Sequence, residues 1–93
     1  MKGKLFIDTS SNKKTLVSLD DKVIEKDSSL WHSQVVLPMI KKLVGKNGLK
    51  AINEIEVNTG PGSFTGLRVG VAIAQALSYA LKIPVNNPEI KYA

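Results

Sequence analysis

A glycine-rich turn at residues 58–68 constrains the fold of this 93-residue chain more than any other segment. The turn joins a short strand-like run at residues 54–57 to the longest helical run, at about residues 65–81. Its three glycines can adopt backbone angles that other residues avoid, and Pro61 stiffens it. A unit of this kind directs the free N–H groups of a helix start into one concave spot, which suits an anion.

The spacing of the turn leaves two interpretations open: an anion site, or a tight strand-to-helix connection that holds no ligand. The turn is not a P-loop, because no Lys-Ser or Lys-Thr pair follows Gly66. Nor do Gly60, Gly62 and Gly66 match the dinucleotide-binding spacing G-x-G-x-x-G, since they are spaced by two and four.

Two charged residues are candidates for an anion or nucleotide site. Asp8 follows a strand end and is the best candidate for a positioned carboxylate, although a turn-forming aspartate fits this place too. Arg68 lies in the first turn of its helix, where the helix dipole disfavours a cation, so we expect it to pair with an anion or with Asp8. The residues predicted to face such a ligand are Asp8, Thr9, Gly60, Gly62, Ser63 and Arg68.

The first half of the chain predicts three successive strands that are most simply antiparallel. Residues 4–7 form an apolar run that ends at a polar turn. Two further runs follow: residues 15–19 set Leu16 and Val17 among polar neighbours, and residues 22–25 carry Val23 and Ile24. Between them Asp20 and Asp21 suit a hairpin turn, although glycine is missing from the favoured second place.

The second half predicts two helices that alternate with strands. After Ser33, a good helix N-cap, apolar residues recur at helical spacing, and Pro38 means that this helix either begins later than Ser33 or kinks. Gly45 and Gly48 end it, and residues 82–85 start a last strand, followed by a polar tail at residues 86–93. The order β-β-β-α-β-α-β indicates an α/β domain with a mixed five-stranded sheet, hairpin strands at one side and parallel strands at the other.

The helix at about residues 65–81 has an unusually apolar surface. Arg68, Gln75 and Lys82 lie seven residues apart and share one arc of about 40°, while nearly all other positions are apolar or small. A helix this apolar needs cover on more than one face. The face expected on the sheet is formed by Gly70, Ile73 and Leu77. The two candidate flanks for the first helix or a second protein are Leu67 with Ala74 and Val69 with Ala76.

Composition limits the chemistry that the chain can perform. With no cysteine and one histidine, His32, it lacks the converging ligands of a zinc or iron site, so no metal, cofactor or catalytic residue is predicted. The net charge of +5 comes from scattered lysines without aromatic neighbours, which favours a solvated surface over nucleic-acid contact. No apolar run approaches the ~20 residues of a membrane span, so we expect one cytoplasmic domain over residues 1–93.

Four segments of the sequence, taken in order, resemble the TsaB (YeaZ) family. They are residues 6–10, residues 32–34 with 37–39, the glycine motif at 60–68, and residues 80–85. The glycine motif is highly specific, and the others add weight by order and spacing. The resemblance runs from about Leu5 to Val85, which is the N-terminal half of a usual family member, and residues 86–89 depart from the expected continuation.

The resemblance implies a single lobe of the actin/Hsp70/sugar-kinase (ribonuclease H-like) type without the family's second lobe. It implies a non-catalytic subunit of the machinery that makes N6-threonylcarbamoyladenosine in tRNA, bound to the catalytic subunit TsaD through two helices and otherwise to itself. Contact with tRNA is then indirect, through the complex. The interface residues expected on the two helices are Val36, Met39, Ile40, Leu43, Leu67, Val69, Ala74 and Ala76.

Two other functions are compatible with the sequence. One is a small nucleotide- or anion-binding protein that uses Asp8 and the glycine-rich turn. The other is a structural fragment whose partner surface is idle. A measurement of nucleotide binding at equilibrium distinguishes the first from a scaffold. A measurement of the protein's mass in solution distinguishes a scaffold that dimerises from the idle fragment.

Overall fold

The computed structural model describes residues 3–11, 14–27, 32–58 and 64–86 of the chain. Its five strands form one mixed sheet in the order β3-β2-β1-β4-β5. The strands are β1 (Lys4–Asp8), β2 (Lys14–Leu19), β3 (Lys22–Asp27), β4 (Glu54–Val57) and the two-residue β5 (Val85–Asn86). β1, β2 and β3 pair antiparallel, whereas β4 pairs parallel with both β1 and β5. The expected division into hairpin strands and parallel strands is therefore confirmed.

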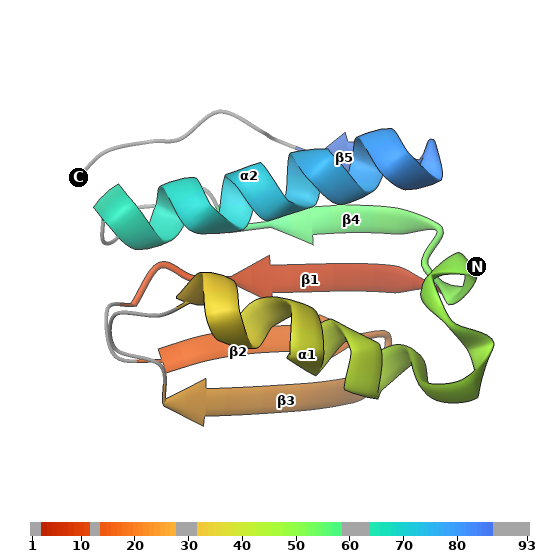
Figure 1. Cartoon of the computed structure of the whole chain (residues 1–93), viewed down its shortest axis with the longest axis horizontal. Coiled ribbons are helices and arrows are strands. Elements are labelled where there is room, and N and C mark those ends of the chain that lie inside the picture. Colours follow the sequence, from red (N-terminus) through yellow and green to blue (C-terminus); the bar gives the residue numbers. More distant parts are fainter. Residues whose placement is uncertain (1–2, 12–13, 28–31, 59–63, 87–93) are drawn as a thin grey trace.

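Two helices, α1 (His32–Val44) and α2 (Phe64–Leu81), lie on the same face of this sheet (Figure 1). α1 packs against β2 and β3, and α2 packs against β1, β4 and β5. α1 runs through Pro38, so this helix begins before the proline and the alternative of a start later than Ser33 is wrong. The short 3-10 helices η1 (Gly45–Asn47) and η2 (Leu49–Ala51) connect it to β4. Within the described ranges, neither helix combines the length and hydropathy needed to cross a lipid bilayer.

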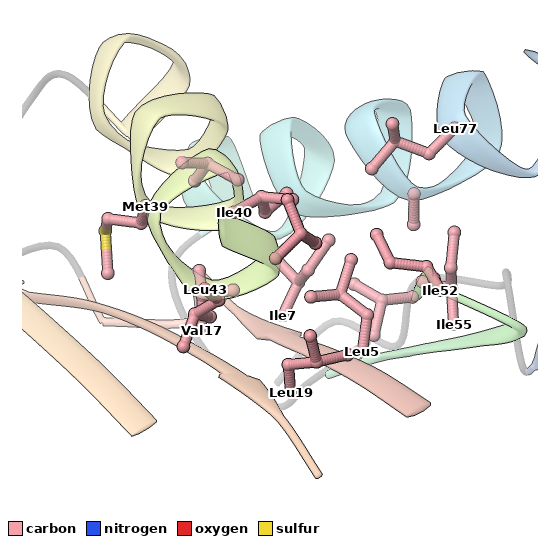
Figure 2. Packing of buried hydrophobic residues seen from close by; sticks show 14 of the residues in the cluster. Leu5, Ile7, Val17, Leu19, Met39, Ile40, Leu43, Ile52, Ile55 and Leu77 are labelled. Carbon is pink, nitrogen blue, oxygen red and sulfur yellow. The ribbon is translucent and has the colours of Figure 1, made fainter. Parts of the chain in front are cut away.

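The hydrophobic core fills the space between the two helices and the sheet (Figure 2). Strand residues alternate between the two faces, so every second residue of β1, β2 and β4 points into this core. The helices contribute the residues that recur at three- and four-residue spacing. The most deeply buried large side chains include Leu5, Ile7, Val17, Val36, Ile40, Ile55 and Leu67.

The hairpin turn between β2 and β3 also anchors the start of β1. Asp20 adopts a left-handed backbone conformation (φ 54°) in this turn. Its carboxylate accepts hydrogen bonds from the backbone N–H groups of Gly3 at 2.9 Å and Lys4 at 3.1 Å. The Gly3 carbonyl in turn accepts a bond from the N–H of Asn53 at 2.7 Å, just before β4. Gly3 therefore joins the first hairpin to the fourth strand.

Candidate functional site

The candidate site lies where β1 and β4 end and α2 begins. β1 and β4 are parallel and in register, with Ile7 opposite Val57, so Asp8 and Asn58 leave the sheet at the same edge. The N–H of Asn58 extends the ladder with a 2.9 Å bond to the carbonyl of Ile7. Open α/β sheets bind ligands at this edge, outside the carboxyl ends of the parallel strands.

Asp8, Ser10 and Asn58 form a connected polar group, the Asp8 cluster. The Asp8 Oδ1 atom accepts bonds from the Ser10 N–H at 2.9 Å, the Ser10 hydroxyl at 2.6 Å and the Asn58 Nδ2 at 3.1 Å. Asn58 Nδ2 also lies 3.2 Å from the Ser10 hydroxyl oxygen. The bond from the N–H of Ser10, two residues after Asp8, gives Asp8 the turn-forming role that the sequence also allowed.

Sequence reasoning missed Asn58 as a member of this cluster. Its signal was present, because a polar residue follows directly after the short strand that precedes the glycine-rich turn. Among the described residues, Ser10 and Asn58 donate to Asp8, and Arg68 lies at an exposed position of α2. Gly60, Gly62 and Ser63 lie outside the described residues. An anion site at the turn therefore stays a prediction.

Thr9 does not face a ligand, contrary to the expectation. Its side chain is fully buried, and its hydroxyl donates a 2.5 Å bond to the carbonyl of Gly66 in the first turn of α2. The physical reason is strand alternation: the residue after Asp8 turns toward the helix layer and must find a buried acceptor. Thr9 thus fastens the end of β1 to the start of α2.

Gly70 permits this close approach of α2 to the sheet. A Cβ atom added at this position would collide with the Thr9 hydroxyl and lie 3.4 Å from a methyl group of Val57. We expect Gly70→Ala to lower the free energy of unfolding by about 1–2 kcal/mol, because overpacking outweighs the better helix propensity of alanine. Urea denaturation followed by circular dichroism measures this. In the double variant with Thr9→Ala the two costs should be less than additive, and full additivity would contradict the collision.

Six of the eight residues expected at a partner interface are buried within the chain itself. Val36, Met39, Ile40, Leu43, Leu67 and Ala74 belong to the core, with exposed fractions of 5% or less. Their side chains fill the space between helices and sheet, so they are not accessible to a partner in this structure. Val69 is half-buried and Ala76 is exposed. Of the two candidate flanks of α2, the one with Leu67 and Ala74 is therefore internal.

The accessible flank of α2 is a line of apolar and mostly small residues, which we call the α2 stripe. It comprises Val69, Ala72, Ile73, Ala76 and Ala80. Val69 and Ile73 are half-buried, and the three alanines are exposed. Arg68, Gln75 and Lys82, which the sequence places on one arc, are exposed. The helix therefore presents both a polar strip and an apolar strip to its surroundings.

The described residues contain no group of three or more His, Cys, Asp or Glu side chains that could hold a metal ion. The side chain of His32 is not described. What the described part of the site offers is one carboxylate held by neutral donors, which can orient a hydrogen-bonding ligand.

The comparisons with known proteins agree on one family. A family model described as "TsaD: tRNA N6-adenosine threonylcarbamoyltransferase" matches residues 9–87. The tRNA threonylcarbamoyladenosine biosynthesis protein TsaB of Buchnera aphidicola subsp. Schizaphis graminum is 41% identical over 86 residues, which cover 87% of this chain and 41% of the relative. TsaB of Escherichia coli (strain K12) is 34% identical over 86 residues, which cover 87% of this chain and 37% of the relative.

A solved structure supports the same assignment. YeaZ from Pseudomonas aeruginosa superposes with a TM-score of 0.74 at 32% identity, over 91% of this chain and 42% of that chain. This chain thus spans about two fifths of the length of these TsaB and YeaZ relatives. The chain belongs to the tRNA N6-adenosine threonylcarbamoyltransferase family and is homologous to its TsaB (YeaZ) members.

Proposed function

We propose that this chain is a non-catalytic scaffold subunit that supports the threonylcarbamoylation of tRNA adenosine next to the anticodon. It does so by binding a catalytic TsaD-like subunit through α2, and it forms a homodimer when that subunit is absent. Contact with tRNA is indirect, through the complex, and the work takes place in the cytoplasm. The names of the TsaB relatives, which place those proteins in threonylcarbamoyladenosine biosynthesis, support this assignment.

The observation that carries the proposal is the α2 stripe. A helix that lies on a sheet buries one face and normally turns charged or polar residues outward. Here Ala72, Ala76 and Ala80 recur at four-residue spacing on the outside, next to half-buried Val69 and Ile73. Small side chains let a second helix approach closely, and the apolar surface gains free energy when water leaves it.

α1 also carries an exposed apolar residue. Leu37 is 50% exposed, in contrast to its neighbours Val36 and Met39 in the core. A partner that covers both helices would bury this side chain. We therefore propose a surface that draws on both helices, as the family resemblance implied, but on other residues than most of those expected from sequence.

The experiment that tests the scaffold is an Ala76→Arg substitution in the α2 stripe. Ala76 is exposed, so the chain should keep its melting temperature. A charge brought into a helix seam without a counter-ion costs several kcal/mol, so binding to the TsaD-like subunit and homodimerisation should weaken more than tenfold. Co-purification with that subunit and light scattering after size-exclusion chromatography measure the two effects.

The matched control is Gln75→Arg, one residue away on the polar strip. It adds the same side chain to the same helix and should bind as the parent does. If the parent is a monomer at high micromolar concentration and does not bind the subunit, or if Ala76→Arg binds normally, the scaffold proposal is wrong.

The alternative function, nucleotide or anion binding, draws on the Asp8 cluster at the edge of the parallel strands. In the actin-like superfamily that the sequence resembles, nucleotide lies between two lobes, and one lobe offers half of such a cleft. Calorimetry with ATP separates the two functions. A dissociation constant near 1 μM, worth about −8 kcal/mol, would favour the alternative.

A further inference from the structure

Thr9 lies where two separate parts of the molecule meet. It is the middle residue of the turn that Asp8 closes, because the N–H of Ser10 donates a 2.9 Å bond to Asp8 Oδ1. Its own side chain is fully buried, and the hydroxyl donates a 2.5 Å bond to the carbonyl of Gly66 in the first turn of α2. The position of this one residue therefore depends on the Asp8 cluster and also sets the position of α2.

The Asp8 cluster fixes the direction in which the Thr9 side chain points. The closed turn holds the backbone on both sides of Thr9. The Ser10 hydroxyl at 2.6 Å and Asn58 Nδ2 at 3.1 Å donate to the same Asp8 oxygen, so the turn is also tied to the residue that follows β4. The branched Cβ atom of threonine restricts rotation about χ1. The cluster thus holds the Thr9 hydroxyl in one place.

The first two turns of α2 receive this hydroxyl in a notch. Gly66 and Gly70 are four residues apart and lie on the same side of the helix. Gly66 supplies the acceptor, and Gly70 leaves the space, because a Cβ atom at Gly70 would collide with the hydroxyl. That Cβ atom would also lie 3.4 Å from a methyl group of Val57, the last residue of β4. The notch therefore sets how closely the start of α2 approaches the ends of β1 and β4 (Figure 1).

The α2 stripe begins in the same two turns of the helix. Val69 and Ile73, its two half-buried members, each stand three residues after one of the notch glycines. The cores of protein interfaces are packed as tightly as protein interiors, so contacts between helices are sensitive to displacements of a fraction of an ångström. A shift of the notch on Thr9 therefore moves the residues that are proposed to meet the partner.

We propose that Thr9 is a positioning residue for the α2 stripe and transmits the state of the Asp8 cluster to this partner-binding helix. With the cluster intact, Thr9 holds the first turns of α2 in the position that the partner fits. When the cluster is broken, the hydroxyl leaves its place and the stripe binds less tightly. This regulation rests on the proposed scaffold function, because it acts on the same surface. It gives the edge of the parallel strands a role in partner binding that requires no nucleotide.

The first test removes the hydroxyl of Thr9. Thr9→Val keeps the shape of the side chain but sets a methyl group against the Gly66 carbonyl, and such a carbon normally stays about 3.3 Å from a carbonyl oxygen. The start of α2 should move away from β1, and the affinity for the TsaD-like subunit should fall by about fivefold or more. Thr9→Ser keeps the hydroxyl and should bind within about twofold of the parent. Calorimetric titration with the subunit measures both affinities.

The second test breaks the Asp8 cluster and asks whether its effect passes through Thr9. Asp8→Ala removes the oxygen that accepts three bonds, so binding of the subunit should weaken severalfold. In the Thr9→Val background the same substitution should weaken binding by less than about twofold, because the connection is already lost. If the two losses multiply as independent effects do, the cluster does not act through Thr9 and the proposal is wrong.

Hydrogen exchange in the isolated chain provides a readout that does not depend on the partner. Asp8→Ala and Thr9→Val should both speed the exchange of amide protons at residues 70–73 of α2 more than the exchange of those in α1. Val17→Ala is the control, because Val17 is fully buried in β2, against which α1 packs. It should speed exchange throughout the core, while the folded protein binds the subunit as the parent does.

These measurements separate a failure of this proposal from a failure of the scaffold function. If the parent does not bind the subunit, the scaffold function is wrong, and the exchange data alone decide whether Thr9 connects the cluster to α2. If the parent binds but exchange at residues 70–73 is unchanged in both variants, the positioning role of Thr9 is wrong. If Val17→Ala weakens binding as much as Thr9→Val does, the loss reflects stability and the proposal is overturned.

Discussion

Ala74→Arg is expected to unfold this chain. Ala74 is fully buried on the internal flank of α2, next to the core residues Val71 and Leu77. An arginine there must either bury its charge without a counter-ion or force α2 away from the sheet. The first alone costs several kcal/mol, a large part of the ~5–15 kcal/mol by which a domain of this size is stable. Urea denaturation and thermal melting should show a lost or strongly shifted cooperative transition.

The comparison with Ala76→Arg makes this result specific. The two substitutions are chemically identical and two residues apart, but Ala76 is exposed. We therefore expect Ala74→Arg to lose the fold and Ala76→Arg to keep the fold but lose binding to its partner. If Ala74→Arg melts like the parent, the internal flank of α2 has been assigned incorrectly.

Ile40→Ala is expected to produce the second large effect. Ile40 in α1 is fully buried above the sheet (Figure 2). Truncation removes apolar contacts and leaves a cavity, so the free energy of unfolding should fall by about 2–5 kcal/mol. The denaturant midpoint should shift in proportion, with little change in the slope of the transition.

Leu37→Ala is the matched control, on the same helix and three residues earlier. Leu37 is 50% exposed, so its truncation should change the free energy of unfolding by about 0.5 kcal/mol or less. Similar losses for the two variants would contradict the orientation of α1 on the sheet.

The elements of this fold could be predicted from local pattern. The strand at residues 54–57 was expected and β4 spans Glu54–Val57, while the helix expected at 65–81 is α2, Phe64–Leu81. β3 was expected to end at residue 25 but continues to Asp27. The extension follows from pairing, because Lys26 and Asp27 stand opposite Thr15 and Lys14 of β2. A polar strand end of this kind has no signal in its own sequence.

The accessible side of α2 could not be predicted in the same way. A helical wheel shows that α2 is apolar nearly all round, but the wheel is symmetric about the expected sheet face and does not distinguish Ala74 from Ala76. The choice depends on where the strands and α1 lie, which is long-range information. Thr9 presents the same difficulty, since its acceptor, the carbonyl of Gly66, lies 57 residues away in the sequence.

The central position of β1 has a consequence for the synthesis of this protein. β1 leaves the ribosome before β2, β3 and β4, and β2 can close one of its edges as soon as the first hairpin forms. Its other edge pairs with β4, so it stays open until the chain has been translated as far as Val57. An unpaired strand edge is a template for pairing with another chain. A slow passage of translation from β3 to β4 therefore lengthens the time during which this edge of β1 is open to another chain.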